Sequence, residues 1–225
     1  MKNVLEARNI SRAFPVAQGE FYALKDVNIA VPEGSLAILK GRSGSGKTTL
    51  INILGALDAP TTGSVIFDGA DMTGMSEHAK EELRRQKVGF IFQSVSLIPI
   101  MTAYENVEFA LRLAGVTSDM KNRAGHCLEM VGLAERMHHM PHEMSGGEQQ
   151  RVAIARAIAH SPRVVFADEP TAELDSATAV HVMKLFGQLV KSENITIVMT
   201  THDRGLMDMG DVLFELEDGV ILNRR

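Results

Sequence analysis

The feature that most constrains this chain is a glycine-rich segment between an apolar run and a helix-forming run. It reads Gly41-Arg42-Ser43-Gly44-Ser45-Gly46-Lys47-Thr48-Thr49 and fits the pattern G-x-x-x-x-G-K-[ST]. Its glycines let successive backbone N–H groups point inward, and the N-terminus of the following helix adds partial positive charge. The sequence therefore predicts a strand, a loop that holds a di- or triphosphate, and a helix. In this arrangement Lys47 reaches the terminal phosphates and the Thr48 hydroxyl binds Mg²⁺.

Two adjacent acids follow a second apolar run. Asp168 and Glu169 come directly after Arg163–Ala167, which is predicted to be a buried strand. Adjacent carboxylates at the end of a buried strand are costly unless a cation or a proton-accepting role stabilises them. Ligand sites in open α/β sheets lie at these strand ends. We therefore expect Asp168 to hold Mg²⁺, directly or through water, and Glu169 to act as general base on an attacking water.

A second candidate anion site precedes the helical run that starts near residue 148. Ser145 can cap this helix, and the bare amides of Gly146 and Gly147 leave room for an anion at its positive end. The chain thus carries two predicted anion-binding helix N-termini.

The hydrophobic pattern predicts an α/β core with a helical insertion. Six short apolar runs are typical of strands: Ser35–Lys40, Ser64–Phe67, Val88–Phe92, Arg163–Ala167, Ile195–Thr200 and Val212–Leu216. Three segments in the middle are typical of helices: Tyr104–Ala114, Lys121–Val131 and Glu148–His160. A mixed-charge run with Glu81 and Arg85 four residues apart indicates a solvated helix face.

Composition excludes several classes of protein. With 23 Lys+Arg and 28 Asp+Glu the net charge is −5, which argues against a surface devoted to nucleic acid. Cys127 is the single cysteine, so neither an internal disulfide nor a four-thiolate zinc site can form. No apolar run reaches the roughly 18 residues of a membrane span, and none of signal-peptide length follows Lys2. We expect a cytoplasmic chain.

The His- and Met-rich segment 137–144 suggests a metal site, but it lacks a fixed ligand spacing and is more simply interpreted as a loop.

Taken together and in order, these motifs resemble those of the ATP-binding subunit of ABC transporters, over essentially all 225 residues. The matching motifs are the Walker A loop Gly41–Thr48, the Q-loop Gln93, the signature Ser145–Gln149, the Walker B segment Val164–Glu169, the D-loop Leu174-Asp175 and the switch histidine His202. Three further stretches are similar to the lipoprotein-release and macrolide-efflux group: 54–58, 88–93 and 102–107.

The resemblance implies a P-loop NTPase core with an antiparallel β subdomain and an inserted α-helical subdomain. Residues 1–93 and 161–225 would form the catalytic core, and about 94–160 the helical subdomain. It also implies hydrolysis of ATP with Mg²⁺ by two copies packed head to tail, so that Ser145 and Gly147 act on the partner's nucleotide.

Roles for individual residues follow from the same resemblance. Catalysis would use Glu169, His202, Gln93 and Lys47, and Mg²⁺ would bind at Thr48, Gln93 and Asp168. Phe14 would stack on adenine, with Tyr22 as a less well-placed rival. The other nucleotide contacts would be Gly41, Ser43, Gly44, Ser45, Gly46, Lys47, Thr48, Thr49, Ser145, Gly146, Gly147 and Asp175. Ala172-Glu173 departs from the Gly-Asn common in this group and places an extra charge near the dimer seam.

The expected partner is a separate transmembrane permease that docks between Gln93 and about Val107 and holds the chain at the inner face of the membrane. The expected task is export or extraction of a hydrophobic substrate, a lipoprotein or an antimicrobial compound. Two alternatives stay open: regulation of cell-wall enzymes across the envelope, and a soluble ABC ATPase without a transport role. The second is disfavoured because the chain has one Walker A motif and no long heptad segment.

Overall fold

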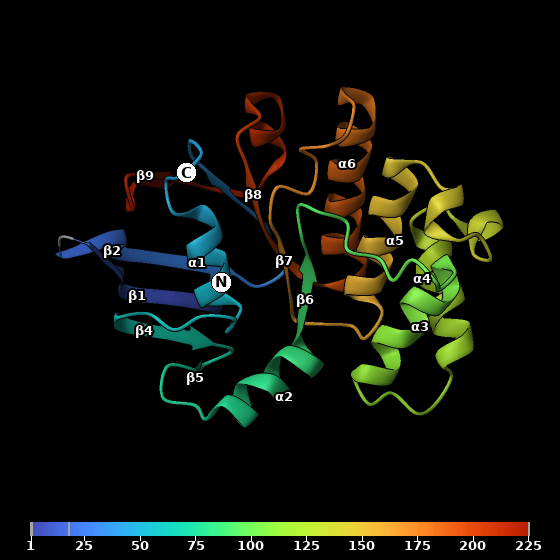
Figure 1. The fold of residues 1–225 in the computed structure, drawn as a ribbon, viewed down its shortest axis with the longest axis horizontal. Helices are drawn as coiled ribbons and strands as arrows, with labels where there is room; N and C mark the ends of the chain where they lie inside the picture. Colours follow the sequence, from blue (N-terminus) through green and yellow to red (C-terminus); the bar gives the residue numbers. More distant parts are fainter. Residues whose placement is uncertain (1, 18, 225) are drawn as a thin grey trace.

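The protein builds two β-sheets that sandwich one helix (Figure 1). The structure is a computed structural model that describes residues 2–17 and 19–224. The smaller sheet is antiparallel in the order β2-β1-β4-β5. Its strands are β1 (Asn3–Val16), β2 (Gly19–Pro32), β4 (Thr62–Phe67) and β5 (Ala70–Asp71).

The larger sheet has the order β10-β9-β3-β8-β7-β6 and is parallel except for β10, which runs against β9. Strands β7 and β8 are buried along their whole length, as expected of parallel strands with apolar residues on both faces. The strands are β3 (Leu36–Lys40), β6 (Val88–Ile91), β7 (Val164–Ala167), β8 (Thr196–Thr201), β9 (Val212–Glu217) and β10 (Val220–Arg224).

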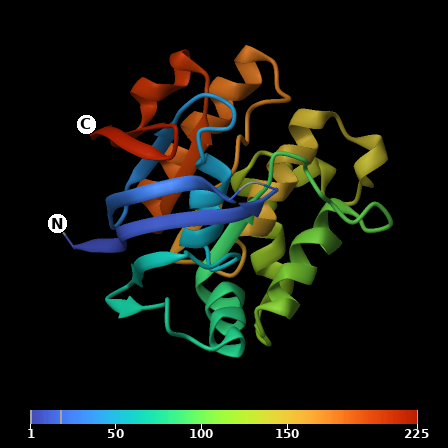
Figure 2. The same cartoon turned by 60° about the vertical axis from the view of Figure 1, so that its left-hand side comes forward.

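Helices cover both faces of this sheet. Figures 1 and 2 show α1 beside the antiparallel sheet, whereas α3, α4 and α5 lie together on the opposite side of the molecule. The α-helices are α1 (Lys47–Leu54), α2 (Glu77–Lys87), α3 (Ala103–Leu113), α4 (Met120–Met130), α5 (Gly146–Ile158) and α6 (Ser176–Glu193). Short 3₁₀ turns follow at η1 (Ala134–Arg136), η2 (Pro141–Glu143) and η3 (Arg204–Met209). Within the described residues no helix has the length and hydrophobicity needed to cross a membrane.

Alternate residues of each central strand enter two different cores. Ala37 and Leu39 of β3 pack with α1 and the antiparallel sheet, whereas Leu36 and Ile38 pack with the helices of the other face. Because successive side chains of a strand point to opposite faces, one apolar run can serve both cores. The P-loop segment thus leaves a strand that is held on both sides.

The structure confirms the six predicted strands and three predicted helices, with ends shifted by one or two residues. The run Ser64–Phe67 belongs to the antiparallel sheet rather than the parallel one. The run pattern did not predict β1 and β2, whose pairing is interrupted by register shifts that break the apolar alternation. The charged helix α2 is exposed as expected, but Arg85 bonds Glu82, at 2.6 Å, rather than Glu81.

The limits of the helical subdomain, about 94–160, stay a prediction. Helix α5 contacts α3 and α4, but it also packs against β6 of the core sheet. A boundary drawn at residue 160 therefore passes through one continuous packing unit.

The contact between β6 and α5 makes Gly89 sensitive to substitution. A Cβ at Gly89 would collide with the carbonyl oxygen of Ala157, so we expect Gly89→Ala to lower the free energy of unfolding by about 1–3 kcal/mol. Gly125 lies in α4 with open space around it, and Gly125→Ala should raise that free energy by roughly 0.5–1 kcal/mol. Urea denaturation measures both, and equal effects of the two substitutions would contradict this packing.

Candidate functional site

The glycine-rich loop leads from β3 into α1 with a backbone that only glycine tolerates at its last position. Gly46, the residue before the helix, has φ +104°, and a Cβ there would lie 2.5 Å from the carbonyl oxygen of Ala23. Helix α1 has no side-chain cap and no acid in its first turn. Its first N–H groups therefore stay available to an anion.

Lys47 is held inside this loop. Its side chain is only 6 % exposed, and Nζ donates hydrogen bonds to the carbonyl oxygens of Gly41, at 2.9 Å, and Arg42, at 3.1 Å. Nζ also lies 3.5 Å from Oε1 of Glu169. The ammonium group is thus oriented by the loop toward the acids that follow β7.

A hydrogen-bonded network joins the loop to those acids. The Thr48 hydroxyl donates to Oδ2 of Asp168 at 2.8 Å, and the Thr200 hydroxyl donates to Oδ1 at 2.7 Å. The same Thr200 oxygen accepts the backbone N–H of Glu169 at 2.8 Å. Each oxygen of Asp168 therefore has a hydroxyl partner, and Thr200 of β8 also holds the backbone N–H of Glu169.

Glu169 lies between Lys47 and His202 in an unusual backbone conformation. Its φ of +45° is unusual for a residue with a side chain, and such strain persists where surrounding bonds over-determine it. Its Oε2 lies 3.3 Å from Nδ1 of His202, whose side chain is 64 % exposed. A hollow of about 130 Å³ opens beside both residues and is also lined by Ala172, Leu174 and Asp203. It offers room for water next to the carboxylate.

The donor set suits Mg²⁺ and a triphosphate. Thr48 and Asp168 present hard oxygen atoms, which Mg²⁺ prefers. The Ser45 hydroxyl is buried in the loop and has no hydrogen-bond partner among the described residues. A buried hydroxyl without a partner is costly, so an oxygen-rich ligand in the loop would relieve it. The residues present therefore fit both groups.

At the second predicted anion site, Ser145 already forms hydrogen bonds within its own chain. Ser145 caps α5, and its hydroxyl and N–H both bond Oε2 of Glu148, at 2.9 and 2.8 Å. These bonds hold the pKa of Glu148 below its usual range. In the described part of the chain no hydrogen bond or ion pair links residues 145–147 to the glycine-rich loop. A nucleotide bound in the glycine-rich loop of the same chain is therefore not connected to residues 145–147 by these bonds.

Asp175 lies next to this segment and caps α6. Its carboxylate accepts the N–H groups of Ala177 and Thr178, at 3.0 and 3.1 Å, and the Thr178 hydroxyl at 2.6 Å. The bond from the Thr178 side chain is the main cause of a lowered pKa of Asp175. The methyl carbon of Thr178 would lie 2.9 Å from a Cβ on Gly147, so the N-termini of α5 and α6 adjoin.

Gln93 and Phe14 lie outside the hydrogen-bonded network. Gln93 follows β6, next to β7, and its side chain is exposed. Phe14 on β1 is 36 % exposed and pairs across the hairpin with Phe21. Tyr22, the rival, pairs with Ala13 and therefore points to the other face of the sheet.

Sequence reasoning missed Thr200. The available signal was a hydroxyl at the end of the otherwise apolar run Ile195–Thr200, two residues before His202. Only the parallel pairing of β7 with β8 shows that this hydroxyl meets Asp168.

Comparison with known proteins agrees with this geometry. The family model described as "ABC transporter" matches residues 24–172. The chain belongs to the ABC transporter family. It is an ATP-binding, ATP-hydrolysing domain of that family, with the corresponding P-loop fold.

Relatives match nearly the whole chain. The ABC transporter ATP-binding protein YtrE of Bacillus subtilis is 42% identical over 97% of this chain and 96% of its own length. The macrolide export ATP-binding/permease protein MacB of Agrobacterium fabrum is 42% identical over 98% of this chain, which spans 34% of MacB. The dimeric post-hydrolysis structure of the Methanocaldococcus jannaschii cassette MJ0796, bound to ADP and Pi, has a TM-score of 0.90 at 38% identity. That match covers 98% of this chain and 97% of the MJ0796 chain.

The role of Thr200 can be tested against a matched threonine on the same strand. Thr200→Val removes the hydroxyl that holds Asp168 and Glu169, so we expect a loss of about 1–3 kcal/mol in stability and a lower rate of ATP hydrolysis. Thr196→Val also removes the acceptor of a backbone N–H, that of Gly34, but far from the acids. It should lower stability alone. Chemical denaturation and phosphate release distinguish the two, and equal turnover in both variants would contradict the assignment.

Proposed function

We propose that this chain is the ATPase subunit of an exporter, in which two copies close on two Mg²⁺-ATP and drive a separate transmembrane permease. The observation that carries the proposal is the contact of the loop residues Lys47 and Thr48 with the acids Glu169 and Asp168. The proposed phosphate-binding lysine, the proposed metal-binding hydroxyl and the proposed base lie there within hydrogen-bond or ion-pair distance of one another.

The glycine-rich loop would hold the triphosphate through the free N–H groups of α1 and through Lys47. The other contacts are assigned to Gly41, Ser43, Gly44, Ser45, Gly46, Thr48 and Thr49. Thr48 and Asp168 would hold Mg²⁺ together with Gln93. When bound, the metal neutralises charge on the β- and γ-phosphates.

Glu169 is assigned as the general base. It would take a proton from a water molecule as the water oxygen bonds to the γ-phosphorus, while the bond from that phosphorus to the β–γ bridging oxygen breaks. ADP and phosphate are the products. His202, 3.3 Å from Glu169, would contact the γ-phosphate, and its exposure leaves it free to do so.

The dimer supplies the remaining contacts. Ser145, Gly146 and Gly147 of one copy would face the γ-phosphate held by the other, with Asp175 at the seam. The dimeric structure of MJ0796 supports this arrangement. Two positive helix ends on one γ-phosphate stabilise its charge better than one.

The permease would dock on the segment from Gln93 to about Val107 and hold the chain at the inner face of the membrane. The similarity to MacB, in which a cassette and a permease share one chain, supports export. The membrane protein that co-purifies with this chain tests the proposal. A permease whose presence raises ATP turnover is the expected result, and purification with a non-transporting cell-wall regulator would contradict it.

Substitution of Glu169 tests its role as base. Glu169→Gln keeps the shape but cannot take the proton, so we expect ATP binding to persist, turnover to fall by about 10²-fold or more, and an ATP-bound dimer to accumulate. Glu129→Gln on α4, an exposed acid outside the site, is the control. Phosphate release and size-exclusion chromatography with ATP report the outcome. Turnover at the wild-type rate in Glu169→Gln would reject the assignment.

Substitution of Lys47 tests the phosphate grip. Lys47→Ala removes a buried ammonium group held toward the phosphates, so the affinity for ATP should fall by roughly tenfold or more. Lys121→Ala, an exposed lysine of α4, should leave affinity unchanged. Equilibrium binding of a fluorescent ATP analogue gives both values. An unaltered affinity in Lys47→Ala argues against the loop as the binding site.

A further inference from the structure

A cation lies against the ring of Phe14. Arg12 is two residues before Phe14 on β1, so both side chains point to the same face of the sheet. The Cζ atom of Arg12 lies 4.6 Å from the centroid of the Phe14 ring, within the range of a cation–π interaction. The guanidinium group therefore covers one face of the Phe14 ring. The exposed 36 % of Phe14 lies away from that contact.

This face of the sheet is the one that looks toward the glycine-rich loop. Arg12 pairs across the hairpin with Leu24, and a side-chain carbon of Leu24 lies 2.9 Å from the place of a Cβ on Gly46. Phe14 and Arg12 thus share a side with the start of α1. Tyr22 lies on the opposite side of the sheet, where its hydroxyl donates to Glu20 at 3.1 Å.

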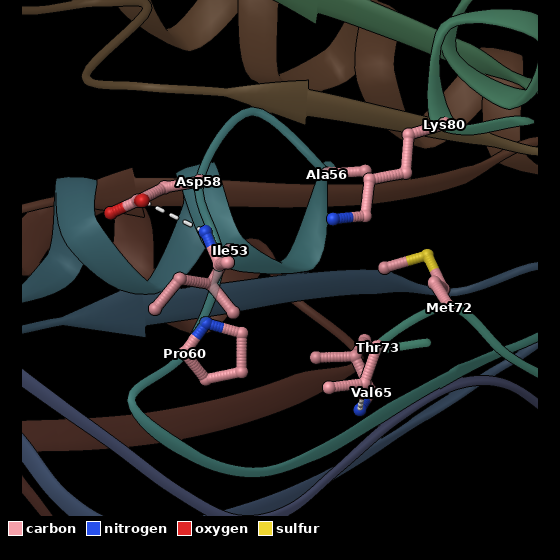
Figure 3. Close-up of a pocket in the computed structure, with 9 residues that line it drawn as sticks. Ile53, Ala56, Asp58, Pro60, Val65, Met72, Thr73 and Lys80 are labelled. Atoms are coloured by element: carbon pink, nitrogen blue, oxygen red, sulfur yellow. Dashed lines mark hydrogen bonds between the residues drawn. The ribbon is translucent and has the colours of Figure 1, made fainter. Parts of the chain in front are cut away.

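Arg12 is itself fixed to the far end of the P-loop helix. Its Nη2 donates to Oδ1 of Asp58 at 2.9 Å. Figure 3 shows Asp58 just beyond α1, where the same Oδ1 accepts the N–H of Ala59 at 2.8 Å. The N–H of Asp58 in turn bonds the carbonyl oxygen of Asn52 within α1. The Nε atom of Arg12 is buried and has no hydrogen-bond partner among the described residues, whereas the guanidinium group contacts the Phe14 ring and Asp58.

We propose that Arg12 is a positioning residue for the nucleotide base. This inference rests on the proposed stacking of adenine on Phe14. The guanidinium group backs one face of the ring, limits its rotation and leaves the other face for the base. Through Asp58 it ties this base platform to the helix whose N-terminus holds the phosphates. The ion pair of Arg12 with Asp58 thereby helps to fix the separation between the base and phosphate sites.

Two ligands separate this role from a general effect on folding. ATP uses both the base platform and the loop, whereas inorganic tripolyphosphate uses the loop alone. We expect Arg12→Ala to weaken ATP binding about three- to tenfold and to leave tripolyphosphate binding within about twofold of the wild type. Arg8→Ala is the matched control, because Arg8 lies on the same strand and forms an exposed ion pair with Glu6. It should change neither affinity.

A conservative variant and a double variant complete the test. Arg12→Lys keeps the charge but loses the planar group, so its ATP affinity should lie between those of Arg12→Ala and the wild type. Once Phe14→Ala has removed the ring, adding Arg12→Ala should cause little further loss. The inference is overturned if Arg12→Ala and Arg12→Lys bind ATP like the wild type, or if both ligands weaken equally.

Phe14→Ala distinguishes the two levels of the proposal. If Phe14→Ala binds ATP as tightly as the wild type, the stacking of adenine on Phe14 fails, and the role of Arg12 fails with it. If Phe14→Ala weakens ATP binding but Arg12→Ala does not, Phe14 keeps its role and only the inference on Arg12 is wrong.

Discussion

The hydrogen-bonded carboxylate of Asp168 is the interaction on which the rest of the site depends. It accepts one hydroxyl from α1 and one from β8, which lie 120 and 32 residues from Asp168 in the sequence, so it joins three separate segments. The parallel order β3-β8-β7 makes this possible, because the carboxyl ends of neighbouring parallel strands meet at one edge. The same hydroxyl of Thr200 holds the backbone of Glu169 in its strained conformation. A single side chain of β8 therefore aligns both the candidate metal-binding acid and the candidate base.

The helix N-termini of this protein differ in a way that matters for anions. Helices α5 and α6 are capped by their own side chains, through Ser145 with Glu148 and through Asp175. Helix α1 has no such cap, and its own first turn carries no acidic residue but begins with the ammonium group of Lys47. A triphosphate therefore meets no competing carboxylate in the first turn of α1. At α5 a γ-phosphate from a second copy would have to share the Ser145 hydroxyl with Glu148, so closure of the proposed dimer would require an exchange of hydrogen bonds.

In the proposed site, the antiparallel sheet would contribute the end that holds the nucleotide base. It packs on α1 through the core that contains Leu24 and Leu50, and the ion pair of Arg12 with Asp58 adds a polar link at the edge of that core. The glycine-rich loop and the proposed base-binding strand thus share α1 as their common support.

The local motifs were predictable from the sequence because they depend on neighbouring residues only. Glycines before a lysine and a threonine make a phosphate loop, Ser145 caps the helix that follows it, and apolar runs bounded by polar residues make buried strands. What depends on pairing between distant strands was not predictable. The register of β1 with β2 places Phe14 and Arg12 toward the loop and Tyr22 away from it. This register contains irregularities, so it cannot be predicted from the alternation of apolar and polar residues. Thr200 reaches Asp168 only because β8 lies beside β7. Arg85 bonds Glu82 rather than Glu81 because of the side-chain geometry on α2. The local sequence is enough to say which chemical groups are present and which short segments carry them. The tertiary structure decided which of them meet, because a strand's register and its neighbours are set by the packing of the whole sheet.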